Sequence, residues 1–122
     1  MISKKRNRPE DIVQKGVVDQ LRARAADNVV WWHTPNGGKR GPIEAARFKR
    51  LGVLAGFPDI AAVKDGALYC MELKADTGRV TPIQYEVLGR LEKAGAYTAI
   101  CHGLDPAIRV LEAWGLLRGK AT

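Results

Sequence analysis

The sequence predicts a single α/β domain in which helices flank a mixed β-sheet, and three observations lead to this prediction. The chain has 122 residues, which is the size of one domain with its own core. Its hydrophobic content of 46% and charged content of 27% are ordinary for a globular protein. Its segments follow the order helix, strand, short helix, hairpin, helix, strand and helix, as in sheets covered by helices.

The first half of the chain begins with a basic segment and a helix. The basic composition of residues 1–8 predicts a flexible tail, so the single domain is expected over 9–122. Pro9 suits the first position of a helix that runs to about Ala26. One face of this helix is marked at near-helical spacing by Glu10, Gln14, Val17, Leu21 and Ala25.

A strand and a short helix follow. The segment "NVVWW" (28–32) predicts a strand, and the turn-rich "TPNGGKRGP" ends it. "PIEAARFKRLG" (42–52) predicts a short basic helix that Gly52 stops.

Two strands flank a tight turn in the middle of the chain. "DIAAV" (59–63) and "ALYCMELK" (67–74) are strand-like, and Asp65-Gly66 between them is a favoured type I′ hairpin pair. A two-residue loop fixes the register of the strands on either side of it.

The last third of the chain predicts helix, strand and helix. The segment 81–95 has Thr81 as N-cap, Pro82 at the first helical position and Gly95 as the stop. A strand is expected over 96–101 and a final helix over 105–117.

The hairpin register converges three charged side chains. Counting outward from the turn, Asp59 falls opposite Glu72, and opposite residues share a face with Cβ atoms roughly 4.5–5.5 Å apart. Lys74 points to the same face because side chains alternate along a strand. An unpaired buried carboxylate is costly, so three such charges indicate a site. The alternative is a cross-strand ion pair of Lys74 with one carboxylate at a sheet edge.

The chemistry that suits these residues is metal-assisted hydrolysis. Two carboxylates this close repel, and a divalent ion between them removes the repulsion. Mg²⁺ prefers oxygen ligands and often takes one or two carboxylates, so Asp59, Glu72 and the backbone carbonyl of Leu73 form the expected set. Lys74 is then placed to orient or deprotonate a water, or to neutralise charge on a phosphate.

The net charge of +7 and the pI near 9.7 favour a polyanionic partner, most simply DNA. The alternative is a basic surface that serves only solubility. The side chains expected to contact DNA are Asn36, Lys39, Arg40, Arg47, Lys49, Arg50 and Arg79.

Several other classes are disfavoured. Cys70 and Cys101 are expected to be core thiols, and with His33 and His102 they have no zinc-site spacing. The "NGGKR" loop matches no nucleotide-binding motif, so no nucleotide cofactor is expected. No apolar run is long enough to span a membrane, and the N-terminus has no signal-peptide core, so a cytoplasmic protein is expected.

The motifs resemble those of a known family. "GFPD" followed by "MELK" resembles the PD-(D/E)XK nuclease signature, and "ELKADTGRVTPIQ" is similar to the VRR-NUC (virus-type replication-repair nuclease) branch. "PNGGKRGPIEAARFKRLGVLAGFPD" resembles small standalone phage-type members. The resemblance runs from about Pro9 to about His102. Phe57 stands where the family usually has a small aliphatic residue before the Pro-Asp pair.

The resemblance implies a PD-(D/E)XK restriction-endonuclease-like core and a role for each matching residue. Asp59 and Glu72 are implied to bind Mg²⁺ or Mn²⁺, and Lys74 is implied to be the catalytic lysine. Glu10, in an E-x-x-x-Q setting, is implied as a further catalytic or metal-binding carboxylate, although a first-turn Glu also suits the helix dipole. Gln84 matches the family's catalytic glutamine, although it also completes a capping box with Thr81.

The expected function is therefore that of a metal-dependent endonuclease that hydrolyses DNA phosphodiester bonds. A chain this small has little surface for reading base sequence, so branched DNA such as a Holliday junction is the expected substrate. The family's standalone members imply a homodimer, encoded by a phage or acting in a bacterial host cell. The alternatives are a non-catalytic branched-DNA-binding module, and a restriction-type or RNA-directed nuclease with the same metal chemistry.

Overall fold

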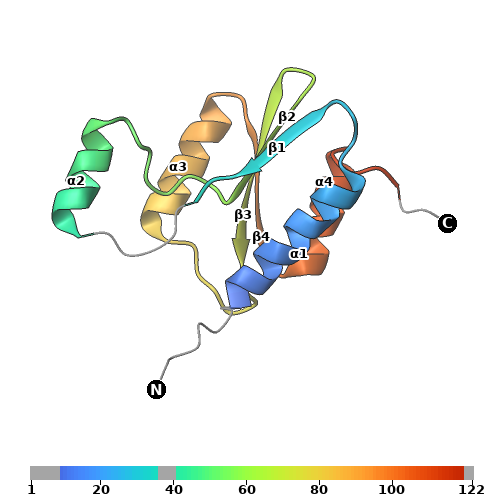
Figure 1. Ribbon diagram of the computed structural model, residues 1–122, viewed down its shortest axis with the longest axis horizontal. Coiled ribbons are helices and arrows are strands. Elements are labelled where there is room, and N and C mark those ends of the chain that lie inside the picture. The colour runs from blue at the N-terminus through green and yellow to red at the C-terminus, as the bar shows by residue number, and fades with distance from the viewer. Residues whose placement is uncertain (1–8, 36–40, 120–122) are drawn as a thin grey trace.

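The computed structural model describes residues 9–35 and 41–119, which form one sheet flanked by helices (Figure 1). No helix in these two ranges is long and apolar enough to cross a membrane. The predicted tail over 1–8 lies outside the described residues. In chain order the elements are α1 (Pro9–Arg24), β1 (Val29–His33), α2 (Pro42–Arg50), β2 (Ile60–Lys64), β3 (Ala67–Lys74), α3 (Pro82–Lys93), β4 (Tyr97–His102) and α4 (Leu104–Ala113).

The four described strands lie in the order β1-β2-β3-β4. β1, β2 and β3 pair antiparallel, whereas β4 pairs parallel to β3 after the chain crosses over through α3. A parallel partner needs such a crossover, and a helix commonly supplies it. The predicted mixed sheet flanked by helices is therefore confirmed.

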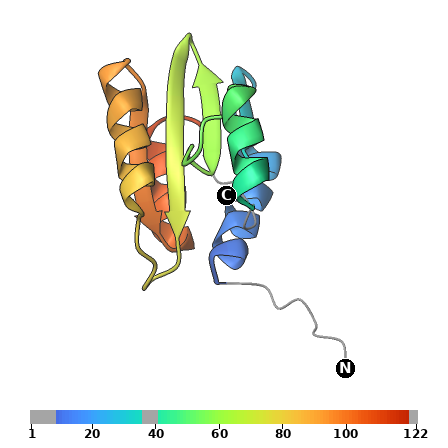
Figure 2. The same cartoon turned by 90° about the vertical axis from the view of Figure 1, so that its left-hand side faces the viewer.

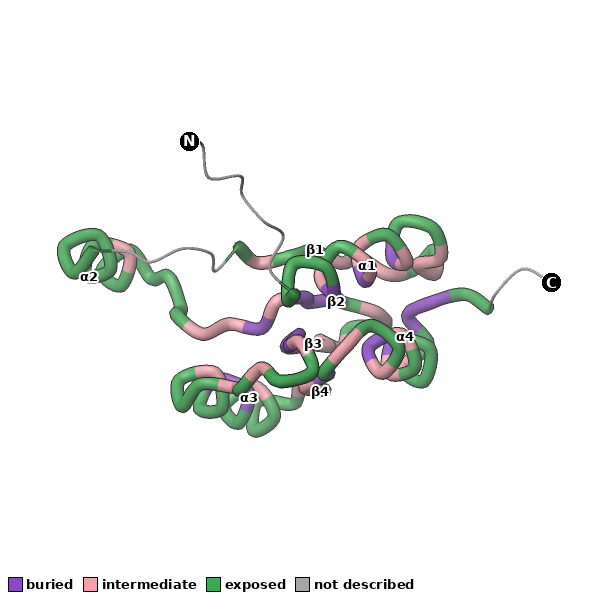
Figure 3. Tube along the Cα trace, turned by 90° about the horizontal axis from the view of Figure 1, so that it is seen from below, coloured by how far each residue is buried: buried purple, intermediate pink, exposed green. Residues whose placement is uncertain are grey.

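The two faces of the sheet are covered differently (Figures 2 and 3). One face, here called the core face, packs against α1 and α4. The other face carries Glu72 and Lys74 and is here called the site face. α3 covers it along β4, with Val87 and Leu88 buried beneath the helix. The sheet therefore separates the main core from the charged residues.

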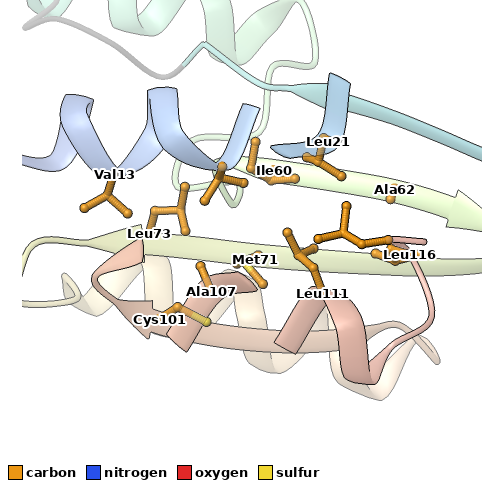
Figure 4. Packing of buried hydrophobic residues seen from close by; sticks show 12 residues of the cluster. Val13, Leu21, Ile60, Ala62, Met71, Leu73, Cys101, Ala107, Leu111 and Leu116 are labelled. Atoms are coloured by element: carbon orange, nitrogen blue, oxygen red, sulfur yellow. The ribbon is translucent and has the colours of Figure 1, made fainter. Parts of the chain in front are cut away.

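The main core fills the layer between the sheet and the pair α1 and α4 (Figure 4). Alternate residues of β2 and β3 point into it, and helical residues spaced three or four apart meet them from the other side of the layer. The largest fully buried members include Val17, Leu21, Ile60, Met71, Leu73, Leu111 and Leu116.

The predicted extent of the last helix is wrong. The prediction carries the helix to residue 117, but α4 ends at Ala113 because Gly115 adopts φ 75°. Leu116 N–H then bonds the Leu111 carbonyl and Gly115 N–H bonds the Glu112 carbonyl, which is the pattern of a Schellman C-cap. The chain turns back and pairs Leu117 with Ala25, so the last leucines join the core instead of a helix.

The other predicted elements are confirmed within one or two residues at their ends. The third strand spans Ala67–Lys74 as predicted. Thr81 caps α3 through a reciprocal pair of hydrogen bonds with Gln84, so the capping box is present. Cys70 and Cys101 are buried free thiols, as expected. Burial raises the pKa of the Cys70 thiol to about 11.

α2 stands apart from the body of the protein. It lies at the far left of Figure 1, beyond α3, and none of its residues is buried. The segment that follows it returns to the body at Gly56, where an added Cβ would lie 3.2 Å from Ile83 of α3.

Two glycines with open surroundings test the role of backbone conformation in this fold. A Cβ added at Gly66 or Gly89 meets no atom within 4 Å, but only Gly66 has a positive φ, of 79°. Gly66→Ala is expected to destabilise the protein by about 1 kcal/mol, because it strains the turn. Gly89→Ala, inside α3, is expected to stabilise it by roughly 0.5–1 kcal/mol. Urea unfolding of both variants measures this, and equal effects of the two would mean that the turn tolerates a side chain.

Candidate active site

The strand register brings Asp59 and Glu72 together. β2 and β3 pair as the turn predicts, as far as Ile60 opposite Met71. One step outward, the Asp59 and Glu72 carboxyls lie close enough to hydrogen-bond each other when one is protonated. Both sit on the site face, because Ile60 and Met71 point to the core face.

Asp59 is held by backbone contacts on two sides. Its Oδ2 accepts a hydrogen bond of 2.8 Å from the Leu73 N–H, and its carbonyl accepts one of 3.1 Å from the Thr34 N–H. The N–H and C=O of a strand residue point to the same side of the strand. The Leu73 carbonyl therefore faces the side on which Asp59 lies, as its predicted role as a ligand requires.

Glu72 is a buried acid, with only 2% of the residue exposed. Burial is the main cause that raises the pKa of its carboxyl to about 8, and the charge and hydrogen bond of Asp59 contribute in the same direction. Lys74 acts in the opposite direction and lowers the pKa, while Glu10 adds to the increase. Near neutral pH the pair therefore retains a proton unless more positive charge reaches it.

Lys74 is a buried cation between two carboxylates. Its Nζ lies 3.7 Å from Glu72 Oε2 and 4.0 Å from Glu10 Oε1. Glu10 comes from the first turn of α1 and is about half exposed, so α1, which packs on the core face, contributes to the same site at the end of β3. The structure thus brings together Asp59, Glu72, Lys74 and, through Lys74, Glu10.

The predicted site residue Gln84 and Gln14, which ends the E-x-x-x-Q setting of Glu10, have different surroundings. Gln84 Oε1 accepts a hydrogen bond of 2.9 Å from the Thr81 N–H, so its side chain completes the cap of α3. Gln14, one turn after Glu10 in α1, has a buried Nε2 with no hydrogen-bond partner among the described residues. The contacts of Gln84 are those of the capping alternative.

The donor set of the site suits a hard divalent cation. Among the described residues no group of three or more His, Cys, Asp or Glu side chains is assembled to hold a metal. Asp59 and Glu72 with the Leu73 carbonyl offer oxygen ligands only, which is the way Mg²⁺ is often held, with water and substrate phosphate completing its shell. The raised pKa of the Glu72 carboxyl agrees with this, because it indicates that the acidic pair lacks the positive charge that a cation would supply.

The predicted DNA-binding residues divide into two groups. Asn36, Lys39 and Arg40 lie outside the described residues. The remaining side chains are exposed. Arg79 lies in the loop after β3, and the last turn of α2 carries Arg47, Lys49 and Arg50.

Two histidines support the site, although no sequence pattern pointed to either. His33 Nδ1 lies 2.7 Å from the Asp59 carbonyl oxygen and donates to it in the Nδ1–H tautomer. His102 pairs with Lys74 across β3 and β4, and its Nε2 lies 3.1 Å from the Gly78 carbonyl oxygen. Each anchors backbone next to a functional residue, and only the paired strands reveal the proximity.

This geometry defines a class of protein. A mixed sheet between helices places an aspartate at the start of one strand opposite the Glu-Leu-Lys run of the next strand, which is the arrangement of a PD-(D/E)XK nuclease-like core. A comparison with solved structures gives one described as a VRR_NUC domain protein, 30% identical, which covers 91% of this chain and 92% of that chain with a TM-score of 0.72. The chain belongs to the VRR-NUC (virus-type replication-repair nuclease) family.

A second solved structure, described as a VRR_NUC domain, is 18% identical and has a TM-score of 0.59, and it supports the fold. It covers 87% of this chain and 97% of that chain. No protein-family model and no curated protein sequence matches the chain.

The raised pKa of Glu72 predicts a pH-dependent stability in metal-free buffer. A carboxyl whose folded-state pKa of about 8 exceeds its ordinary 4.5 contributes stability that is full below about pH 4.5 and is lost as the pH rises toward 8. The free energy of unfolding, measured in EDTA, should fall for wild type as the pH rises through this range. The fall relative to Glu72→Gln should be on the order of a few kcal/mol. The control is Glu86→Gln, which changes an exposed acid of α3 and should follow the wild-type curve. Parallel curves for wild type and Glu72→Gln would mean that Glu72 ionises normally.

Proposed function

We propose that this nuclease-family domain is a divalent-metal-dependent endonuclease that hydrolyses phosphodiester bonds of branched DNA, such as Holliday junctions, and works as a homodimer. The observation that carries the proposal is the buried acidic pair Asp59 and Glu72 with Lys74 beside it. Groups with such perturbed ionisation cluster at functional sites.

The cofactor in this proposal is Mg²⁺ or Mn²⁺, held by Asp59, Glu72 and the Leu73 carbonyl, with Glu10 as a further candidate ligand. When bound, the ion supplies the positive charge that offsets the acidic pair and the charge on phosphoryl oxygens. The Leu73 N–H fixes the Asp59 carboxylate, and the Glu72 carboxyl, whose pKa is raised to about 8, would lose its proton when the ion binds.

Lys74 has the proposed role of a catalytic lysine. Its ammonium is buried within 4 Å of the Glu72 carboxylate, so its position is set by the site and not by solvent. There it orients the attacking water and stabilises negative charge that develops on the phosphate. Gln84 is proposed to assist from the start of α3, where its side chain is partly exposed.

The proposed substrate follows from charge and size. Exposed basic residues of α2 and of the loop after β3 offer phosphate contacts, whereas base-edge readout needs more surface than this small domain provides. A two-fold dimer suits a four-way junction because two sites then face symmetric strands. With such a substrate, the proposed activity belongs in the cytoplasm of a bacterial or phage-infected cell.

A second candidate function is a non-catalytic branched-DNA-binding module. The observation in its favour is that Lys74 already contacts both Glu72 and Glu10, so these charges partly satisfy one another. In that case the acidic pair is a structural network and the protein binds DNA without cutting it. Cleavage assays separate the two candidates.

The first test is cleavage of a labelled four-way junction, a flap, linear duplex and single-stranded DNA, each with Mg²⁺, Mn²⁺ or EDTA. Metal-dependent cutting with a preference for the junction is expected. Asp59→Asn and Glu72→Gln should lose activity and metal affinity, because each removes a ligand charge. Lys74→Met should lose turnover by on the order of 10²-fold or more while metal affinity, measured by calorimetry, is kept.

The matched control for these variants is Glu86→Gln, which should cut at the wild-type rate. Junction binding without cutting in any metal would support the non-catalytic module. Equal cutting of every DNA would leave a nuclease but refute the preference for branches. If a labelled RNA added to the panel were cut and none of the DNAs were, the RNA-directed alternative would be supported.

A second test concerns the basic residues of α2. The triple variant Arg47→Gln, Lys49→Gln and Arg50→Gln should weaken junction binding and make its salt dependence shallower. The slope of the log binding constant against the log salt concentration should fall by roughly 0.9 for each phosphate that the protein no longer neutralises. The control triple changes exposed basic residues on other helices and alters the net charge equally: Arg22→Gln, Lys93→Gln and Arg109→Gln. The same slope change in both triples would mean that α2 binds no phosphates and that only net charge matters.

A further inference from the structure

The two ion-pair contacts of Lys74 do not by themselves fix the direction of its side chain. The Nζ lies 3.7 Å from Glu72 Oε2 and 4.0 Å from Glu10 Oε1, and both distances exceed that of a hydrogen bond. Charge attraction without hydrogen-bond geometry draws the ammonium toward the carboxylates but gives it little directional specificity. Because Lys74 is only 5% exposed, the groups that pack on its stem decide where the ammonium lies.

The tight turn that follows β3 packs directly on this stem. Residues 75–78, here called the 75–78 turn, belong to the yellow loop between β3 and α3 in Figure 1. The turn is closed by a hydrogen bond of 2.9 Å from the Gly78 N–H to the Ala75 carbonyl. A Cβ added at Gly78 would lie 3.3 Å from Lys74 Cβ, so the glycine backbone itself lies against the lysine. A side chain at this position would force the turn or the lysine to move.

The neighbouring strand β4 holds the 75–78 turn through His102. This residue pairs with Lys74, and because Cys101 before it points into the core, His102 points to the site face, as Lys74 does. Its Nε2 lies 3.1 Å from the Gly78 carbonyl oxygen and donates to it in the Nε2–H tautomer. The next residue, Gly103, donates its N–H to the Lys74 carbonyl at 2.9 Å. The end of β4 therefore fixes both the backbone of the lysine and the turn that lies on its stem.

We propose that His102 is a positioning residue for Lys74. Its hydrogen bond to the Gly78 carbonyl holds the 75–78 turn on the lysine stem and so keeps the ammonium beside Glu72. His102 is exposed, so its ring is not needed to fill the core. The consequence for cleavage rests on the proposed function, in which Lys74 orients the attacking water, whereas the contact itself requires neither DNA nor metal.

The first test measures how fast acetic anhydride acylates Lys74 in EDTA and without DNA, with mass spectrometry as the readout. Lys74 should react slowly in wild type because it is buried. His102→Leu removes the donor and should raise this rate on the order of 10-fold, as expected for the loss of one hydrogen bond. His102→Gln places an amide nitrogen as many bonds from Cβ as Nε2 is and should restore the slow rate, whereas the shorter His102→Asn should not. Lys93, which is exposed on α3, is the internal reference and should react at the same rate throughout.

The second test measures the kinetics of junction cleavage for the same variants. His102→Leu should lower kcat on the order of 10-fold and change KM by less than about threefold, because the lysine acts on the reacting water and the basic residues of α2 are untouched. His102→Gln should recover most of the lost kcat, and His102→Asn should not. The matched control is Thr77→Ala, which changes an exposed residue of the same turn and should match wild type in both tests.

A double-variant cycle shows whether the effect passes through the turn. Gly78→Val places a branched side chain against Lys74 and should raise the reactivity of Lys74 by itself. Combined with His102→Leu, it should add little, because both changes release the same turn. Circular dichroism and urea unfolding establish that each variant is folded.

Four outcomes overturn the proposal. Unchanged reactivity of Lys74 in His102→Leu would mean that the turn stays in place without the hydrogen bond. Equal behaviour of His102→Gln and His102→Asn would mean that the position of the donor is irrelevant. Additive effects of His102→Leu and Gly78→Val would mean that His102 acts by another route, and raised reactivity with an unchanged kcat would refute its role in cleavage. The lysine measurements need no activity, so they test the contact even if wild type cuts no DNA, and the failure of one proposal is distinguished from the failure of the other.

Discussion

Because a two-residue turn at Asp65 and Gly66 joins β2 to β3, the pairing of these strands is fixed from the turn outward to Asp59 and Glu72. A slip of one residue would send every side chain of a strand to the opposite face. Glu72 would then face α1 and α4, and Met71 would leave the core. The packing of the core and the geometry of the site are therefore set by one register, and neither can change without the other.

The site holds more negative charge than its surroundings stabilise. Glu72 is buried beside Asp59, and Lys74 offsets only part of the cost, since the pKa of Glu72 stays at about 8. Well-packed apolar residues at such positions are often at least as stable as a buried ionic group. A local conflict of this kind, surrounded by an otherwise consistent core, is typical of a functional site. It is also the reason why a divalent cation is proposed to complete the site.

The fold covers its surfaces unevenly, and the uncovered parts bear on the proposed function. α1 and α4 close the core face, whereas α3 covers the site face only on the β4 side. The open part of that face carries both the acidic pair and exposed apolar residues, and α2 carries exposed basic and apolar residues, none of them buried. DNA is proposed to bind on this face, where its phosphates would meet the exposed basic residues of α2.

The sequence by itself determined the order of the elements, the hairpin register and the convergence of Asp59, Glu72 and Lys74, because each follows from a local pattern: caps, a type I′ turn and the alternation of side chains along a strand. Local patterns failed where tertiary contacts decide. The last helix ends early so that its final leucines can enter the core, and α2 stands away from the body although its sequence reads like that of any short surface helix. The approach of Glu10 to the lysine and the support of Asp59 by His33 join residues far apart along the chain. Only the packing of helices and strands across the sheet brings such groups within reach of one another.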